Sequence, residues 1–394
     1  MLYDLTTYST LLLIFFSQGL VFSYHLFIKA KQENNLSSFW LGCFIVLSSI
    51  YILPWMLGYA SWYRYEPYRT IMFYVPFQHL FLIGPILYFY TQSLLNPKFR
   101  FDKQQSSHLI LGFLYVLFST WMWIYDCFIS NTAYFYGDGR DRELDNWYQI
   151  SGVLSMSYYC IQSIIIYNNY KQSIFDKVSF ADSILFSWIK KYLILFLIIQ
   201  ILRIVFFVLF PEWGSFNQKG LYYLCFSLFF YYIALKGLLM NFKPIYAYQN
   251  AINEEFKEIE QNISYQDNEL LTELDYWKGK IIQFVQVDEH YKNQELTLFN
   301  IAKGLQTNST VISNVINRGF GINFNDFINR YRVDAFKEKV TAGEYQKTTI
   351  LGLAYDCGFN SKTTFNRSFK KATGQTPKEF LEAEKNSKQI SAKS

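Results

Sequence analysis

Residues 350–371 read ILGLAYDCGFNSKTTFNRSFKK, and this stretch decides the fold predicted for the C-terminal part of the chain. Ile350, Leu353 and Ala354 are spaced three and four positions apart, so they share one face of a helix. Gly358 follows at the place where that helix must end, because glycine adopts the left-handed backbone of a turn at almost no cost. The pattern therefore predicts a short helix and a sharp turn.

A second short helix is predicted after the turn. Asn360 or Ser361 can begin it by accepting a backbone N–H, and Phe365 and Phe369, four positions apart, lie on its buried side. Its other face presents polar and cationic side chains, namely Lys362, Thr363, Asn366, Arg367 and Lys370. A short helix with such an outer face is suited to the major groove of double-stranded DNA, so the stretch predicts a helix-turn-helix pair.

An earlier stretch repeats this arrangement. Apolar residues at helical spacing form its first helix and the inner face of its second, namely Leu298, Ile301, Ala302, Leu305, Ile312, Val315 and Ile316. The predicted outer face of the second helix carries Thr310, Val311, Ser313, Asn314 and Arg318. A helical stretch over about residues 325–340 joins the two pairs. The two outer faces would then meet successive major-groove faces, about 34 Å apart along DNA.

The motifs of the second pair also resemble a known family. In order, they are Ile350-Leu-Gly-Leu-Ala354, Gly358-Phe359, Phe365-Asn-Arg-Ser-Phe369-Lys-Lys and Gly374-Gln-Thr-Pro377. This combination is similar to the signature of AraC/XylS-type DNA-binding domains, and the resemblance covers about residues 276–385. It implies two helix-turn-helix units joined by a long helix, and a role in the regulation of transcription. Matched by motif, the implied base contacts fall on Lys362, Thr363, Asn366 and Arg367, and on Thr310, Val311, Ser313 and Asn314.

Several positions depart from the family pattern. Gln306 stands at the usual turn glycine of the first pair, and Val311 replaces a residue that is often larger or polar. Phe380–Leu381 stands where an aromatic residue followed by Arg is frequent, which removes one expected backbone contact. Gly352, inside a helix, costs up to about 1 kcal/mol relative to Ala. We therefore expect the first pair to bind DNA weakly, or to read its shape.

Charge divides the chain into three blocks. Residues 1–240 contain 16 Lys/Arg and 12 Asp/Glu, residues 241–275 contain 2 and 8, and residues 276–394 contain 18 and 11. The last block is thus basic, which suits a polyanion partner, although a basic face can equally be a solvated surface. Aromatic residues make up 21% of the chain and charged residues only 17%, against about 25% in ordinary soluble domains. A single soluble globule is therefore excluded.

The first block contains apolar stretches of membrane-spanning length. A bilayer core needs about 20 mostly apolar residues in a helix. Seven stretches qualify, at about Tyr8–Ile28, Phe39–Ala60, Thr70–Leu95, His108–Ile129, Trp147–Tyr167, Trp188–Phe210 and Leu221–Met240. We expect Pro54, Pro76 and the Gly84–Pro85 step to kink the second and third spans.

Basic residues in the loops predict the orientation. With the N-terminus outside, nine Lys/Arg lie on the inner side, namely Lys29, Lys31, Lys98, Arg100, Lys103, Lys171, Lys177, Lys236 and Lys243. Five lie on the outer side, namely Arg64, Arg69, Arg140, Arg142 and Lys219. Cytoplasmic loops carry the excess of Lys and Arg. The predicted location is the inner cell membrane, with several crossings and a cytoplasmic C-terminal domain.

Four polar side chains are predicted inside the spans. Arg203, Asp126, Gln78 and His79 lie toward the outer halves of their spans, where charge is costly unless it is paired. They form a candidate ligand pocket that opens to the outside. The alternative is a structural role, with an Arg203–Asp126 pair and an interhelical hydrogen bond from His79.

The acidic connector, residues 244–275, has helical patterns of its own. Phe256, Ile259 and Ile263 are spaced like one helix face. This face could dimerise two copies, or belong to a solvated linker helix. A wider apolar stripe over Leu270–Val285 is expected to begin the core of the soluble domain.

No enzyme is predicted. The five cysteines form no C-x-x-C pair or Cys/His cluster with metal spacing, and only four histidines are present. Residues 276–394 contain no dinucleotide-binding glycine motif, Walker loop, kinase motif or nucleophile elbow. We therefore expect no metal ion and no cofactor.

These observations predict an all-α protein, with a seven-helix transmembrane bundle and a soluble domain of two helix-turn-helix units joined by a long helix. The predicted domains are residues 1–243 in the membrane, 244–275 as linker, 276–385 as DNA-binding domain and 386–394 as tail. The predicted function is a membrane-anchored transcriptional regulator that binds DNA and lipid, forms a candidate homodimer and senses an unidentified external or membrane-borne ligand. Two rivals stay open: a receptor or transporter with a C-terminal protein-interaction module, and a regulator released by cleavage of the linker.

Overall fold

The computed structural model describes residues 3–96, 98–130, 132–137, 139, 142–205, 216–240 and 274–391. The chain divides into two units. The described residues of ranges 1–168 and 188–243 form the N-terminal unit, and those of ranges 169–187 and 244–394 form the C-terminal unit. Within the described residues every regular element is a helix, and one isolated antiparallel bridge pairs Val178 with Thr297. The predicted all-helical class is therefore confirmed.

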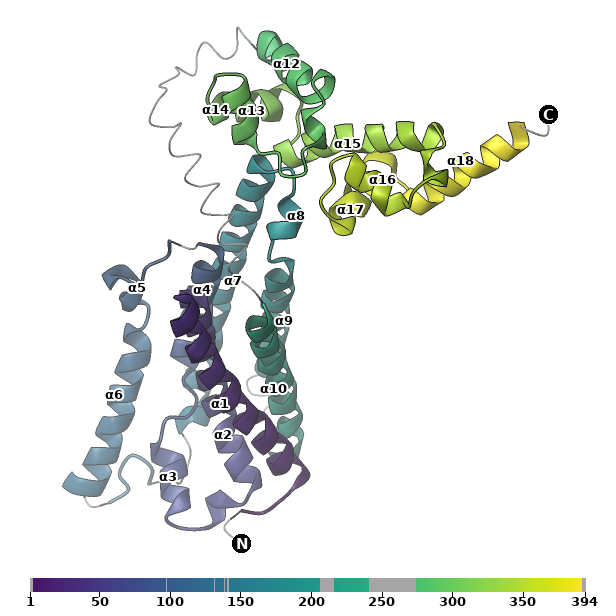
Figure 1. Cartoon of the computed structure of the whole chain (residues 1–394). Helices are drawn as coiled ribbons and strands as arrows, with labels where there is room; N and C mark the ends of the chain where they lie inside the picture. Colours follow the sequence, from purple (N-terminus) through teal and green to yellow (C-terminus); the bar gives the residue numbers. More distant parts are fainter. Residues whose placement is uncertain are drawn as a thin grey trace. The chain divides into compact units, whose positions relative to one another are not determined.

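The N-terminal unit is built mainly from long apolar helices, with the short helices α3 and α5 between them (Figure 1). Its helices are α1 (Thr7–Glu33), α2 (Leu36–Tyr59), α3 (Tyr68–Tyr74), α4 (Leu80–Leu95), α5 (Lys103–Ser107), α6 (Ile110–Ile124), α9 (Ser187–Ile204) and α10 (Phe216–Leu239). Helix α7 (Asn146–Lys177) begins in this unit and ends in the other. A Cβ at Gly19 of α1 would lie 2.2 Å from Ser49 Oγ of α2 and 3.3 Å from the Phe230 ring of α10, so glycine allows these helices to pack closely at this position.

Among the helices that the structure describes, five are long and apolar enough to cross a membrane. They are α1, α2, Ile110–Ile129, α7 and Lys219–Leu239, the third of which joins α6 to a π-helical turn at Tyr125–Ile129. Leu111, Phe113 and Leu117 on α6 are all more than half exposed. An apolar face of this kind on a soluble protein would be an interaction surface, and lipid is a suitable partner for it.

The third predicted span is not one helix. The expected helix over Thr70–Leu95 breaks between α3 and α4, where residues 75–79 are not helical. Pro76 lies in the break, and the carboxylate of Glu143 accepts the backbone N–H groups of Phe77 and Gln78 at 3.0–3.1 Å. These bonds satisfy backbone groups that a continuous helix would have used. The predicted kink at Pro76 is thus a break in the helix, and the single span over Thr70–Leu95 is not confirmed.

The number of crossings therefore stays a proposal. Helix α4 has 16 residues, or roughly 24 Å at the rise of an α-helix, and a bilayer core is about 30 Å thick. Helix α9 has 18 residues and carries Lys190, Lys191 and Arg203. Neither helix satisfies the length and charge criteria that the other five satisfy.

Helix α7 extends further than predicted. The apolar stretch that predicts it ends at Tyr167, whereas the helix continues to Lys177. Residues from Asn169 onward, with the short helix α8 (Ala181–Ile184), belong to the C-terminal unit. We refer to residues 169–187 as the α7–α9 segment. Its grouping with the C-terminal helices was not indicated by the sequence.

The remaining helices of the C-terminal unit lie in two groups. The first group consists of α12 (Leu274–Ile282), α13 (Leu298–Gly304) and α14 (Ser309–Asn314), followed by a π-helical turn over Val315–Gly319. The second group consists of α16 (Ile350–Asp356), α17 (Lys362–Thr373) and α18 (Pro377–Ser391). Helix α15 (Phe324–Thr341) runs between the two groups (Figure 1), as the stretch over 325–340 predicts.

Each group has its own apolar core. Ile301, Ile312 and Val315 are fully buried in the first, and Leu353, Phe365 and Phe369 are at most 1% exposed in the second. The apolar stripe predicted over Leu270–Val285 contributes its C-terminal end to the core of the first group, where Ile281 and Val285 are fully buried. The linker prediction for residues 244–273, including Phe256, Ile259 and Ile263, lies outside the described residues.

Candidate nucleic-acid interface

The first helix-turn-helix pair consists of α13 and α14. Thr297 and Asn300 form a capping box at the start of α13, and the side chain of Asn308 accepts the Val311 backbone N–H at 2.7 Å to start α14. Gln306 in the turn has φ +53°. The departure from glycine therefore places a residue with a side chain in the left-handed region, which costs about 1–2 kcal/mol.

The outer face of the first pair differs from the prediction at one position. Thr310 and Arg318 are exposed, and Ser313 and Asn314 are partly exposed. Val311 is only 1% exposed, because it packs in the core of the first group. The expectation that Val311 lies on the outer face was therefore wrong. Val311 lies one position after Thr310, about 100° further around the helix, and this rotation turns its apolar side chain toward the core.

The second pair consists of α16 and α17, and its local structure follows from its caps. Thr349 accepts the Gly352 backbone N–H at 3.0 Å at the start of α16. Gly358 has φ +93° in the turn, as predicted. Ser361, rather than Asn360, caps α17 by accepting the Thr364 backbone N–H at 3.2 Å. Gly374, with φ +79°, ends the helix.

Helix α17 has a sharply divided surface. Phe365 and Phe369 are buried against α15, with ring centroids 4.8 and 5.5 Å from that of Phe336. Four of the predicted base-reading or phosphate-binding side chains are exposed, namely Lys362, Thr363, Asn366 and Lys370. The structure thus brings them together on one helical face, where their donors can meet a polyanion.

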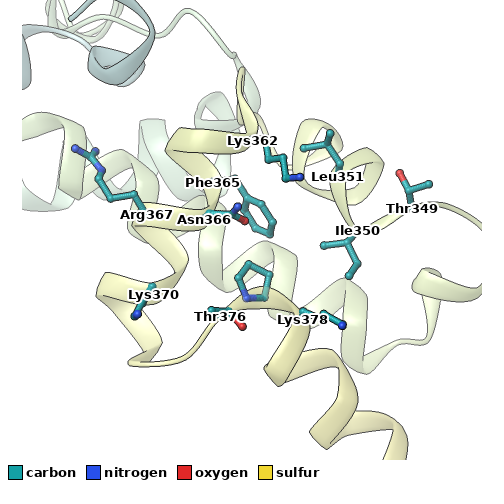
Figure 2. Close-up of a pocket in the computed structure, with 11 residues that line it drawn as sticks. Thr349, Ile350, Leu351, Lys362, Phe365, Asn366, Arg367, Lys370, Thr376 and Lys378 are labelled. Atoms are coloured by element: carbon teal, nitrogen blue, oxygen red, sulfur yellow. The ribbon is translucent and has the colours of Figure 1, made fainter. Parts of the chain in front are cut away.

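A hollow of about 710 Å³ lies beside this face. It is formed where α17 approaches the start of α16 and the start of α18 (Figure 2). Apolar side chains line its floor, and cationic side chains line it from α17 and α18, namely Lys362, Arg367, Lys370 and Lys378. Figure 2 shows the guanidinium of Arg367 directed away from Ile350 and Lys378, on the other side of α17.

Arg367 differs from the other predicted readers, because its guanidinium already has partners. Its Nη1 atom lies 2.8 Å from Oδ1 of Asp182, and its Nη2 atom donates to Oδ1 of Asn325 at 2.9 Å. Its Cζ atom lies 4.7 Å from the ring centroid of Phe175. Asp182 and Phe175 belong to the α7–α9 segment. Burial raises the pKa of Asp182 and the nearby Arg367 opposes that shift.

Helix α15 carries a buried polar stripe that the sequence analysis missed. Asn325, Asn329 and Arg332 lie four and three positions apart, and each is at most 1% exposed. Arg332 donates to the backbone oxygens of Tyr291 and Asn293 at 2.8 and 2.7 Å. Burial lowers the pKa of Arg332 to about 9, so its guanidinium stays charged at neutral pH. The sequence signal that could have revealed this stripe is the helical spacing of three polar residues among apolar ones.

This stripe holds the α7–α9 segment. Asn325 donates to the Val178 backbone oxygen and Asn329 to the Ser179 backbone oxygen, both at 3.2 Å. Arg332 Nη2 lies 3.0 Å from Ser179 Oγ. The Ser179 backbone N–H in turn donates to the Leu296 backbone oxygen at 3.1 Å. The segment is therefore bonded to α15 and to the start of the first pair.

The candidate ligand pocket of the N-terminal unit is only partly assembled. Arg203 Nη2 donates to Gln78 Oε1 at 3.1 Å and also bonds to Gln149 Oε1. The Arg203 Cζ atom lies 5.1 Å from the Tyr51 ring centroid. Arg203 is fully buried and Gln78 is 1% exposed, so the protein itself covers this polar cluster.

The other two candidates have different surroundings. Asp126 accepts the Tyr74 hydroxyl at 2.5 Å and the Phe135 backbone N–H at 3.1–3.2 Å. Its described partners thus differ from those of Arg203, and the Arg203–Asp126 pair is not among the contacts that the structure gives. His79 stands at the N-terminal end of α4 and is partly buried.

The described residues contain no group of three or more His, Cys, Asp or Glu side chains that could hold a metal ion.

Comparison with known proteins finds a family model, several relatives and a solved structure that match part of the chain. A helix-turn-helix domain family model matches residues 301–383. Uncharacterized HTH-type transcriptional regulators of Staphylococcus aureus strains COL and N315 are each 29% identical over 101 residues.

Those matches cover 26% of this chain and 13% of each relative, so the chain spans about an eighth of the length of these relatives. A solved structure of a protein of unknown function from Listeria innocua is 25% identical, covers 27% of this chain and 94% of that one, and has a TM-score of 0.24. The family match shows a helix-turn-helix domain in the C-terminal part of the chain, and a domain of this kind indicates DNA binding.

Proposed function

We propose that the protein is a membrane-anchored, sequence-specific regulator of transcription whose AraC/XylS-type domain reads double-stranded DNA from the cytoplasmic side. The observation that carries this proposal is the exposed polar face of α17, which lies inside the region that matches a helix-turn-helix domain. Five apolar helices of sufficient length support the membrane anchor.

The contacts of the α7–α9 segment support the proposed orientation. The segment contains Lys171 and Lys177, which the excess of basic residues assigns to the inner side of the membrane. It packs within the C-terminal unit, with Val178 and Ala181 fully buried in the core of the first group. A loop and a domain that share a core must lie on the same side of the membrane. The helix-turn-helix domain is then cytoplasmic, where it can reach DNA.

Arg367 is the proposed base reader with the clearest test. A guanidinium can donate two hydrogen bonds to one guanine edge, and the loss of such a pair costs about 1–3 kcal/mol. We expect Arg367→Ala in the full chain, held in lipid nanodiscs, to weaken binding to its operator duplex by up to that amount in a titration, because the contacts that Arg367 makes within the free protein offset part of the gain from reading a base. Arg330→Ala is the matched control, because Arg330 is an exposed arginine of the neighbouring helix α15. Equal affinities for the two variants would show that Arg367 does not read a base.

Lys370 is the proposed phosphate contact. It is exposed on α17, whereas the neighbouring Lys371 lies 2.6 Å from the Asp326 carboxylate and is already neutralised. Each phosphate contact releases counterions, so its loss lowers the slope of log K against log salt by about 1. We expect Lys370→Ala to produce this change and Lys371→Ala to produce less of it. The reverse order, measured between 50 and 200 mM salt, would assign the phosphate contact to Lys371.

The signal is proposed to enter through the N-terminal unit. A ligand can shift the protein only if it binds two states of that unit with different affinities. Arg203, Gln78, Asp126 and His79 remain the proposed polar groups for such a response. We also propose that the connector, residues 244–275, dimerises two copies of the chain.

A further inference from the structure

We infer that the α7–α9 segment is a built-in inhibitor of DNA reading, which holds Arg367 through Asp182 until a signal releases it. This inference rests on the proposed function and concerns the regulation of the same site. It starts from the partners of one side chain. Both terminal nitrogens of the Arg367 guanidinium are engaged inside the C-terminal unit, Nη1 with Asp182 and Nη2 with Asn325.

The geometry excludes simultaneous base reading. The bidentate contact of an arginine with guanine uses two N–H groups of the fork, directed along one edge of the base. In Arg367 the fork is instead directed at a carboxylate and an amide oxygen, with the Phe175 ring 4.7 Å from Cζ. The other members of the face, such as Asn366 and Lys370, are exposed. The α7–α9 segment therefore prevents Arg367 from reading a base. It leaves the other polar and cationic side chains of α17 exposed for non-specific contacts with DNA.

The contact is also protected from water. The side chain of Asp182 is only 14% exposed and that of Arg367 is 35% exposed, so this pair is screened less than an ion pair on an open surface. The Asp182 carboxylate holds Arg367 through Oδ1, and its Oδ2 atom is buried without a hydrogen-bond partner among the described residues.

The segment that carries Asp182 is firmly attached on its other side. Its apolar residues Phe175, Val178, Phe180, Ala181 and Ile184 are buried in the core of the first helix-turn-helix group. The polar stripe of α15 binds its backbone, as described above. The segment thus contacts the first pair, α15 and α17 at once. The chain joins it at both ends to helices of the N-terminal unit, α7 and α9.

A signal can reach the α7–α9 segment through its connections to α7 and α9. A change in the N-terminal unit that displaces the segment would separate Asp182 from Arg367 and free the guanidinium for DNA. The apparent affinity of a protein whose competent state is only partly populated is reduced by that fraction. Weakening the Asp182 contact alone should therefore raise operator affinity without any signal.

The test uses Asp182→Asn in the full chain, which keeps the shape of the side chain and removes its charge. Its affinity is measured in lipid nanodiscs with an operator duplex recovered by mapping the protein on the genome. We expect about tenfold tighter binding, a value within the usual range of coupling between sites. Asp176→Asn is the matched control, because Asp176 is an acid of the same segment that interacts electrostatically with Lys177. It should leave the affinity unchanged.

A double-mutant cycle separates release from simple electrostatics. Removing any negative charge near DNA could strengthen binding, but release requires the guanidinium to be present. The inference predicts that Asp182→Asn has no effect in an Arg367→Ala background. If Asp182→Asn strengthens binding equally in both backgrounds, the effect is electrostatic and the inference is wrong. If it weakens binding in the wild-type background, Asp182 positions Arg367 for DNA, which also overturns the inference.

The same cycle distinguishes a failure of this inference from a failure of the proposed function. Loss of binding in Arg367→Ala with no effect of Asp182→Asn leaves the proposed function standing and removes the inhibitor. Absence of operator binding by every variant removes the proposed function itself. Hydrogen exchange of the α17 amides reports whether Asp182→Asn is folded. If that variant loses protection, Phe175→Leu decides in its place, with tighter binding expected and unchanged binding contradicting the inference.

Discussion

Replacing Arg332 by methionine should lower the free energy of unfolding of the C-terminal unit by about 3–5 kcal/mol, because a buried hydrogen-bond network loses its donor. Its guanidinium donates to the backbone oxygens of Tyr291, Asn293 and Ser179 and to the side chain of Asn329. Methionine fills much of the volume but removes the donor of these four hydrogen bonds. Arg332 itself is fully buried, so water cannot replace it.

Native-state hydrogen exchange of the full chain measures this loss at the amides of α15. Arg330→Met is the matched control, because Arg330 is exposed on the same helix two residues earlier. It should change the free energy of unfolding by less than about 0.5 kcal/mol. Arg332→Lys keeps the charge but cannot form the fork of bonds, so it should lie closer to methionine than to the wild type. Equal protection in the Arg332→Met and Arg330→Met variants would contradict the role assigned to Arg332.

Replacing Gly358 by alanine should destabilise the second helix-turn-helix group by about 2–4 kcal/mol. The left-handed backbone alone costs a residue with a Cβ about 1–2 kcal/mol. The Cβ would also lie 2.5 Å from the Tyr291 backbone oxygen and 2.8 Å from the Lys292 Cα. Both atoms belong to backbone, which cannot rotate away as a side chain can, and overpacking of this kind costs about 1–3 kcal/mol more.

Gly374→Ala provides the control for the backbone part of this cost. Gly374 has φ +79°, and a Cβ there would meet no atom within 4 Å. Its substitution should therefore cost only the conformational part. The difference between the two variants, read from hydrogen exchange at the amides of α16 and α17, isolates the collision with the Tyr291–Lys292 backbone. Equal costs would show that this backbone can move aside.

Local patterns in the sequence predict much of the C-terminal unit. The spacing of Ile350, Leu353 and Ala354, the turn at Gly358 and the buried Phe365 and Phe369 are all confirmed. Such features depend on neighbours three or four residues away, so periodicity and turn chemistry are sufficient to find them.

Features that depend on distant residues could not be predicted. The break between α3 and α4 is stabilised by Glu143, 66 residues after Phe77. The surroundings of Arg367 depend on Asp182, which belongs to a segment that the sequence indicates only as a loop between two spans. The motif resemblance assigns Arg367 to DNA, and it says nothing of the partner that Arg367 has in the absence of DNA.

The α7–α9 segment also affects the choice of sample. A fragment of residues 276–394 would lack Val178 and Ser179, which are the partners of Asn325, Asn329 and Arg332. It would also lack Asp182, and so the contact that holds Arg367. Quantitative DNA binding should therefore be measured on the full chain.

The central claim is that the intact protein occupies specific DNA sites through the exposed face of α17 while its N-terminal unit stays in the membrane. Genome-wide mapping of the membrane-bound full chain, compared with Arg367→Ala, tests it most directly. We predict discrete sites that share a sequence and that lose occupancy in the variant. Enrichment no greater than that of a chain ending at residue 275, or sites that persist unchanged in Arg367→Ala, would contradict the account.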